Sequence, residues 1–142
     1  MRCFAADGDR NAPALRVSAR IGDQKPGLFM VYPQGNFVEA SDETPFFQIG
    51  ETRYGRPILV RAFDRAMSME PAITLLFLSF ASTRKASLSV GMPPDMHAYR
   101  ADSLQARVQR RGGADDAWFA RLSPDWGNAL RSVFDGLPDN TL

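Results

Sequence analysis

Histidine and cysteine, two side chains often used for nucleophilic and metal chemistry, are nearly absent from this sequence. Its 142 residues contain one cysteine, Cys3, and one histidine, His97. A single cysteine excludes a disulfide within the chain and suits a reducing compartment. One Cys and one His leave only carboxylates as further zinc ligands, so we expect no metal and no cofactor. Because His97 falls on the solvent side of a predicted strand, we expect no Ser-His-Asp or Cys-His site.

An excess of one charge sign is also missing. Seventeen basic and sixteen acidic residues leave a net charge of +1. This balance gives no electrostatic argument for nucleic acid or an anionic membrane as partner. The basic run from Arg107 to Arg111 is interpreted as a solvated strand end or loop.

No apolar run is long enough for a bilayer. The longest, Ala72–Ala81, holds ten residues, whereas a spanning helix needs about 20. The first residues lack the apolar core of a signal peptide. We therefore expect a cytoplasmic protein of one domain with no membrane partner.

Strand signals dominate the first part of the chain. Gly27–Pro33 and Asn36–Ser41 are rich in β-formers and flank a turn that contains glycine, which predicts a hairpin. Phe46–Gly50 is predicted to be a third strand. Leu15, Val17 and Ala19 alternate briefly, which is compatible with a short strand.

Helices and a second strand pair are predicted next. Tyr54–Phe63 reads as a short helix with a proline in its first turn. A longer helix begins after the cap residue Ser68 and runs to about Thr83. It is apolar nearly all round, so we expect it to be covered on both sides, by a sheet beneath and by another helix or another subunit above. Ala86–Met92 and Asp95–Ala101 are predicted to form a strand pair.

The last part of the chain predicts helical segments. Asp115 and Asp116 begin one, Ser123-Pro124 begins or kinks the next, and Gly136 closes it. A stripe of apolar residues at helical spacing is predicted to face the core: Trp118, Phe119, Leu122, Trp126, Leu130 and Phe134. Runs of strands and runs of helices that are separated in this way indicate an α+β fold.

Four stretches of the sequence resemble one known family, the bacterial proteasome-type peptidases called the ancestral beta subunit family (Anbu). They are Lys25–Ala40, Thr44–Leu59, Ser82–Leu104 and Trp126–Pro138. Their order and spacing follow the C-terminal half of the family. Residues 1–20 do not match it. The resemblance therefore predicts an unmatched segment over residues 1–20 and the C-terminal part of a proteasome-like peptidase domain over residues 21–142.

The resemblance implies an αββα sandwich of the N-terminal-nucleophile hydrolase class. In that class a terminal Thr, Ser or Cys attacks the peptide carbonyl with its own amine as base, while an Asp and a Lys from early strands assist. Those groups belong to the front half of the family's fold, and Met1 has neither hydroxyl nor thiol. Cleavage before Cys3 would expose a thiol, but Cys3 lies too close to the late strands in sequence. We therefore expect an incomplete sandwich, with its front strands missing and no catalytic residue.

Five residues match the surroundings of the family's active site. Gly50 and Glu51 correspond to a turn beside the catalytic terminus, and Ser87, Ser89 and Gly91 match a strand motif near it. The resemblance gives them a supporting role in the active-site region and no direct part in the chemistry. Peptide becomes a substrate only if the front half is supplied.

Two other functions stay open. A non-catalytic self-assembly subunit is compatible with the apolar helix and with the uncovered faces of half a sandwich. Its partners would be further copies or other proteasome-like subunits, since family members form ring-like or helical oligomers. The third reading is a small α+β binding module.

Overall fold

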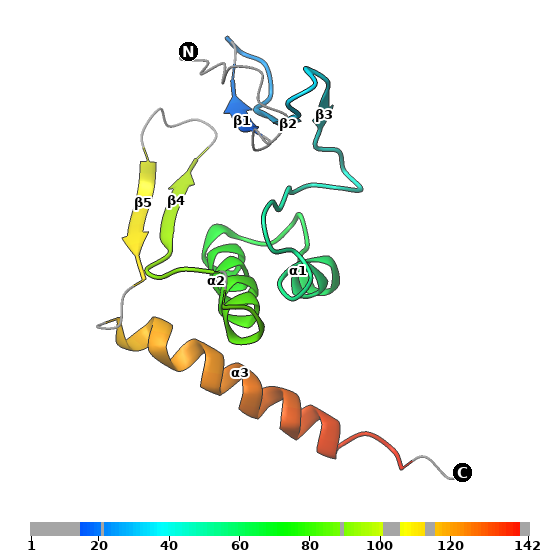
Figure 1. Cartoon of the computed structure of the whole chain (residues 1–142), viewed down its shortest axis with the longest axis vertical. Coiled ribbons are helices and arrows are strands. Elements are labelled where there is room, and N and C mark those ends of the chain that lie inside the picture. Colours follow the sequence, from blue (N-terminus) through cyan, green and yellow to red (C-terminus); the bar gives the residue numbers. More distant parts are fainter. Residues whose placement is uncertain (1–14, 21, 89, 101–105, 113–115, 140–142) are drawn as a thin grey trace. The chain divides into compact units, whose positions relative to one another are not determined.

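The computed structural model describes residues 15–20, 22–88, 90–100, 106–112 and 116–139, and the chain divides into two units, residues 1–50 and 51–142. The first unit contains β1 (Leu15–Ala19), β2 (Gly27–Val31) and β3 (Phe37–Glu39). The second contains α1 (Arg56–Ala62), α2 (Met69–Ala86), β4 (Asp95–Tyr99), β5 (Ala106–Arg111) and α3 (Ala117–Asp135) (Figure 1). Over the described residues the fold is therefore mixed, with three helices and two small sheets.

The first unit is an antiparallel sheet in the order β1-β2-β3. Leu15 lies opposite Val31 in one pair, and Phe29 lies opposite Glu39 in the other. The β2–β3 turn contains Gly35 at φ +87°, a conformation that L-residues with a side chain rarely adopt. The hairpin and the short first strand are thus confirmed.

The third strand predicted over Phe46–Gly50 is wrong. Residues 46–49 have no regular secondary structure and pair with no described strand. Phe46 and Phe47 are half-buried. The strand signal in these residues reflects apolar side chains that favour burial, whereas a strand also needs a neighbouring backbone to complete its hydrogen bonds.

In the second unit α1 packs closely against α2. The helix α1 begins after Gly55 and carries its proline in the first turn, as predicted, although it is shorter than Tyr54–Phe63. A Cβ added at Gly55 would lie 2.5 Å from both Ser79 Oγ and Thr83 Oγ1. The close approach of the two helices therefore requires glycine at this position.

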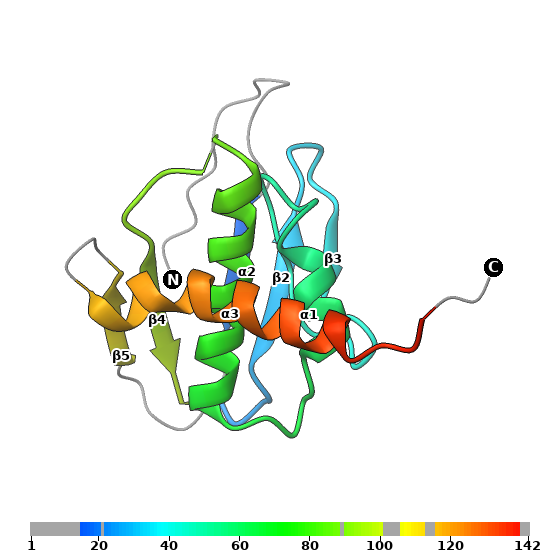
Figure 2. The same ribbon diagram turned by 90° about the horizontal axis from the view of Figure 1, so that it is seen from below.

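The helix α2 forms the centre of the second unit. It begins after Ser68, as predicted, and extends past Thr83 to Ala86, but Ser68 makes no capping hydrogen bond through its side chain within the described part of the chain. Phe77 is only 2% exposed, and its ring meets Trp118 and Phe119 of α3 edge to face at 5.6 and 5.5 Å. The helices α1 and α3 pack against α2 (Figure 2), which confirms the neighbouring helix, whereas the sheet expected beneath α2 stays a prediction. The core residues, among those described, are Leu59, Leu75, Phe77, Leu78, Ala81 and Phe119.

The second sheet differs from the predicted pair. The partner of β4 is β5, with Asp95 opposite Arg111, and the described residues of 87–92 form no strand. The helix α2 continues through Ala86, and the Ser87 N–H still bonds to the Thr83 carbonyl at 2.8 Å, so this stretch begins as a helix end. Within β4 the predicted alternation is confirmed, and His97 lies on the exposed side.

The C-terminal region forms one helix, α3, with Pro124 inside it. The predicted core-facing stripe is confirmed only near its start, where Phe119 is buried. Farther along, Leu130 and Phe134 are 50% and 73% exposed. The reason is visible in Figures 1 and 2, where the second half of α3 continues past α2.

Candidate functional site

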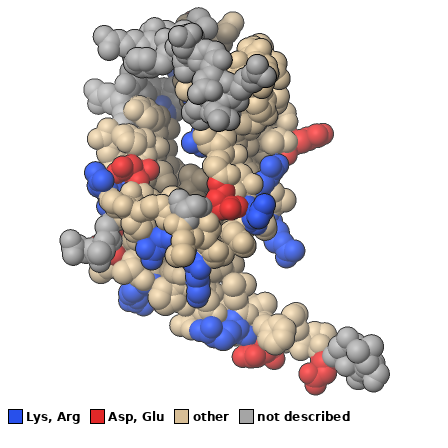
Figure 3. Space-filling model, viewed as in Figure 1, with Lys and Arg blue, Asp and Glu red and all other residues tan. Residues whose placement is uncertain are grey.

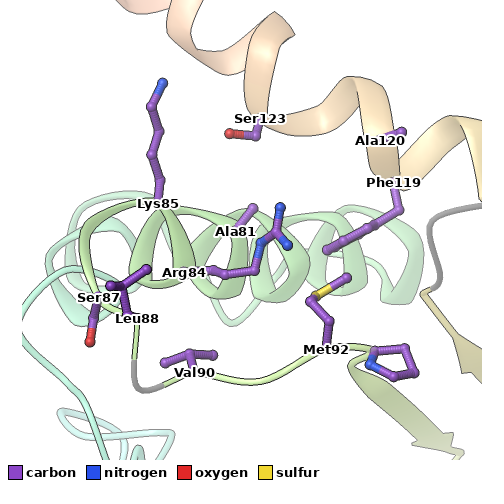
Figure 4. A pocket seen from close by; sticks show the side chains of 11 residues that line it. Ala81, Arg84, Lys85, Ser87, Leu88, Val90, Met92, Phe119, Ala120 and Ser123 are labelled. Atoms are coloured by element: carbon purple, nitrogen blue, oxygen red, sulfur yellow. The ribbon is translucent and has the colours of Figure 1, made fainter.

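One pocket of about 820 Å³ opens in the second unit. Its walls are the last turns of α2, described residues between Ser87 and Pro93, and the first half of α3. Figure 4 shows Arg84 and Lys85 extending from the end of α2, with Phe119 on the α3 wall and Met92 on the wall formed by the connecting segment. A volume of this size suits a small ligand or a short peptide segment, since ligand pockets span about 300–1,000 Å³.

The chemistry of this pocket is cationic and apolar. Arg84 and Lys85 are its charged lining residues, and Ser87 and Ser123 contribute hydroxyl groups. Most of the remaining surface is apolar, and the described lining contains no carboxylate and no imidazole. The pocket can therefore attract an acidic group attached to an apolar one, but its described lining holds no carboxylate or imidazole to act as general base for a serine.

Gly50 was predicted to support the active-site region and has an unusual backbone conformation. Its φ is +79°, while a Cβ built on it would meet no atom within 4 Å. Glycine is thus favoured here by backbone conformation and not by lack of space. Gly50 closes the first unit, whereas the other predicted residues belong to the second.

The remaining predicted site residues have local roles where the structure describes them. Arg53 N–H donates to Glu51 Oε1 at 3.0 Å, which closes a short turn. Ser87 caps the end of α2 and lines the pocket. Gly91 is exposed, and a Cβ there would meet nothing within 4 Å. Ser89 lies outside the described residues. Their supporting role in the active-site region stays a prediction.

A polar cluster at the start of α3 was not predicted as a unit. Arg110 donates to both oxygens of Asp116 at 2.8 and 2.7 Å, and its guanidinium lies 4.6 Å from the centre of the Trp118 ring. Asp116 also accepts the Phe119 N–H at 3.1 Å as the helix cap. The Arg110 hydrogen bonds hold the pKa of Asp116 below its usual value. The cap was readable from the sequence, but its partner on a strand was not.

The described residues show no sign of a metal site or a membrane span. These residues include no cluster of three or more His, Cys, Asp or Glu side chains that could hold a metal ion. In the same part of the chain, no helix is both long and apolar enough to cross a bilayer.

The comparison with known proteins rests on solved structures. No protein-family model and no curated protein matches the sequence. Anbu from Hyphomicrobium is 44% identical to this chain, with a TM-score of 0.82 over 88% of this chain and 54% of its own. Anbu from Yersinia bercovieri is 38% identical, with a TM-score of 0.82 over 88% of this chain and 53% of its own. An Anbu complex from Pseudomonas aeruginosa, described as a helical assembly, is 39% identical, with a TM-score of 0.81 over 88% of this chain and 52% of its own.

These matches cover most of this chain and about half of each Anbu chain. The sequence of this chain is about 40% identical to these Anbu sequences, and the folds agree as well. The similarity is therefore one of sequence and fold together. The resemblance predicted from the four sequence stretches is thus confirmed: the structural neighbours of this chain are Anbu proteins, and the coverage fits the C-terminal portion of an Anbu subunit.

Proposed function

We propose that this chain acts as the C-terminal portion of a bacterial proteasome-type peptidase subunit of the N-terminal-nucleophile class, and that these 142 residues do not hydrolyse peptides by themselves. The observation that carries the proposal is the coverage, 88% of this chain against 52–54% of the Anbu chains. The resemblance assigns the nucleophile, its amine and the assisting lysine to the other half of the fold. The single cysteine supports a reducing, cytoplasmic location.

The lysines of the chain support the proposed inactivity. The sequence has only two, Lys25 and Lys85, and both are exposed. A lysine that assists ionisation of a nucleophile has to lie next to it in a desolvated site. Neither lysine is therefore in a desolvated position, which supports the proposed inactivity.

The proposed fold is an incomplete αββα sandwich. The match of this chain to about half of each Anbu chain supports it, since the remaining strands and helices of such a sandwich would then lie in the other half. Gly50, Glu51, Ser87, Ser89 and Gly91 would then support the active-site region of the completed fold.

A peptidase assay tests the inactivity. The purified 142-residue chain is incubated with fluorogenic peptides, with and without a covalent proteasome inhibitor. We expect no turnover above buffer. Turnover that the inhibitor abolishes would contradict the proposal. A Ser87→Ala, Ser123→Ala double variant is the matched control, since any turnover it shares with the parent does not come from the pocket hydroxyls.

A complementation assay tests the supporting residues. The front half of Hyphomicrobium Anbu, ending where its similarity to this chain begins, is co-expressed with this chain. If turnover is restored, Glu51→Ala and Gly50→Val should reduce it, and the exposed Val60→Ala should not. If the two site variants keep parental turnover, Gly50 and Glu51 have no supporting role.

Self-assembly is the second function that a specific observation favours. The second half of α3 exposes Leu130, Val133 and Phe134 along one helix, and a related Anbu complex forms a helical assembly. Exposed apolar side chains in a row favour association in water. Analytical ultracentrifugation should show discrete oligomers. A monomer that melts cooperatively would favour the small binding module instead, and polydisperse aggregate would contradict both.

A further inference from the structure

The helix α3 consists of a packed half and an exposed half. Phe119 is buried, and the half-buried residues that follow it in the helix are Leu122, Ser123, Trp126 and Gly127. From Asn128 to the end of the helix every residue is exposed. Figure 3 shows this end of α3 extending away from the rest of the second unit. The packing that supports α3 therefore ends near the middle of the helix.

The two residues least suited to a helix interior lie at this boundary. Pro124 has no N–H, so the Ala120 carbonyl cannot receive the helical hydrogen bond from it, and the proline ring crowds that carbonyl. Gly127 follows within one turn and leaves the backbone freer than a residue with a side chain would. Prolines are among the main sites at which helices bend sharply. The backbone of α3 is therefore weakest where its packing ends.

Neither residue has a packing reason in the described part of the chain. A Cβ at Gly127 would meet no atom within 4 Å, so no close neighbour requires glycine there. Gly55 is the opposite case, because a Cβ at that position would clash with two hydroxyl groups. Pro124 is exposed and lies well inside the helix, whereas prolines are tolerated at the first turn. What Pro124 and Gly127 share is their effect on the backbone.

The first half of α3 is fixed to two other elements. Arg110 of β5 donates to both oxygens of Asp116, the cap of α3, at 2.8 and 2.7 Å. Phe77 of α2 meets the rings of Trp118 and Phe119 edge to face. These contacts hold the start of the helix in one direction, while the residues beyond its middle are exposed.

We propose that α3 bends at Pro124–Gly127, so that residues 128–135 move as one helical arm relative to the fixed first half. At a rise of 1.5 Å per residue, about 12 Å of helix separates Gly127 from Asp135. A bend of about 20°, the lower limit of a sharp kink, therefore moves the end of the arm by about 4 Å.

The arm carries the exposed apolar side chains of α3. Leu130, Val133 and Phe134 are each at least 50% exposed and lie along one face of the helix. A rigid helix presents this face in one direction, whereas a hinged arm adjusts its direction to the surface that it meets. The motion belongs to the single chain, so its test does not depend on the self-assembly proposed above.

Distances between two spin labels measure this motion in the full 142-residue chain. Cys3→Ser removes the native thiol, and Val60→Cys on the exposed face of α1 is the common reference site. It is combined with Asp135→Cys on the arm or with Arg121→Cys on the fixed half, both of which are exposed. Labelled chain is diluted with an excess of unlabelled chain, at a concentration at which sedimentation velocity shows a monomer.

The pair that ends on the arm should give a distance distribution about twice as wide as the pair that ends on the fixed half. Pro124→Ala combined with Gly127→Ala restores the helical hydrogen bond and removes the free glycine backbone. This double variant should narrow the arm distribution to the width of the fixed pair. Ser132→Ala is the matched control, because it raises helix propensity within the arm and leaves the hinge intact. It should keep the parental width.

Amide hydrogen exchange separates bending from local unfolding. The amides of residues 130–134 should exchange more slowly in the parent than in the urea-unfolded chain, because an arm that moves as a unit keeps its helical hydrogen bonds. Exchange as fast as in the unfolded chain would mean that the arm is frayed, and the inference would be wrong. Equal widths for the two label pairs in the parent would mean that α3 is rigid. A wide arm distribution that persists in the double variant would place the motion elsewhere and would also overturn the inference.

Discussion

Replacing Phe77 by alanine should remove a large part of the stability of the second unit. The ring is 2% exposed and touches Trp118 and Phe119 of α3 edge to face. Because nearly the whole side chain is buried, the loss should reach the usual cost of a phenylalanine-to-alanine change in a core, about 3–5 kcal/mol. Domains are stable by only about 5–15 kcal/mol, so the variant should lose a large share of its free energy of unfolding.

A double-mutant cycle isolates the contact between α2 and α3. Phe77→Leu and Trp118→Leu are combined, and urea unfolding is followed by circular dichroism at 222 nm, since one tryptophan is lost. The edge-to-face pair at 5.6 Å should give a coupling of about 0.5–1.5 kcal/mol. Val60→Ala, at an exposed position of α1, should change the free energy of unfolding by less than about 0.5 kcal/mol. If Phe77→Ala costs no more than Val60→Ala, the aromatic cluster is not the core of this unit.

Three further predictions concern backbone and charge. Gly55→Ala places a Cβ 2.5 Å from two hydroxyl oxygens of α2 and should cost about 1–3 kcal/mol in urea unfolding, whereas Gly91→Ala, with open space around it, should be nearly neutral. Gly50→Ala should cost about 1–2 kcal/mol through its positive φ alone, and Gly50→Asn less. Because Arg110 lowers the folded-state pKa of Asp116, the carboxylate stabilises the fold above its unfolded-state pKa. That stabilisation disappears as the pH falls through the folded-state pKa, and acid titrations of the melting temperature should show a weaker pH dependence for Asp116→Asn.

The parts of the fold that depend on residues close together in sequence could be predicted from the sequence. The β2–β3 hairpin follows from a turn that contains glycine between two β-rich runs, and β4 follows from strict alternation over five residues. The starts of α1 and α2 follow from a proline and from Ser68. Each of these signals acts over about one turn or one strand, so the rest of the chain was not needed to interpret it.

The parts that depend on distant residues were not readable. The Arg110–Asp116 pair joins a strand to a helix cap, and sequence spacing does not indicate which basic residue reaches the carboxylate. The pocket forms where α2 ends beside the first half of α3, an arrangement set by the packing of Phe77 against two aromatic rings. The five predicted site residues came only from the family resemblance. The structure places Gly50 in the first unit, whereas Glu51, Ser87 and Gly91 belong to the second.

The wrong predictions share one physical cause. Residues 46–49, the described residues of 87–92 and the end of α3 have sequences suited to strand pairing or burial. The first two contain no strand, and the end of α3 is exposed. An apolar sequence pattern indicates that a segment favours burial or strand pairing. The residues that bury it or pair with it can lie on another polypeptide. A strand requires backbone hydrogen bonds from a neighbouring strand, which another part of a proteasome-like fold can supply. The exposed stripe of α3 requires only side-chain packing, which a second copy can provide.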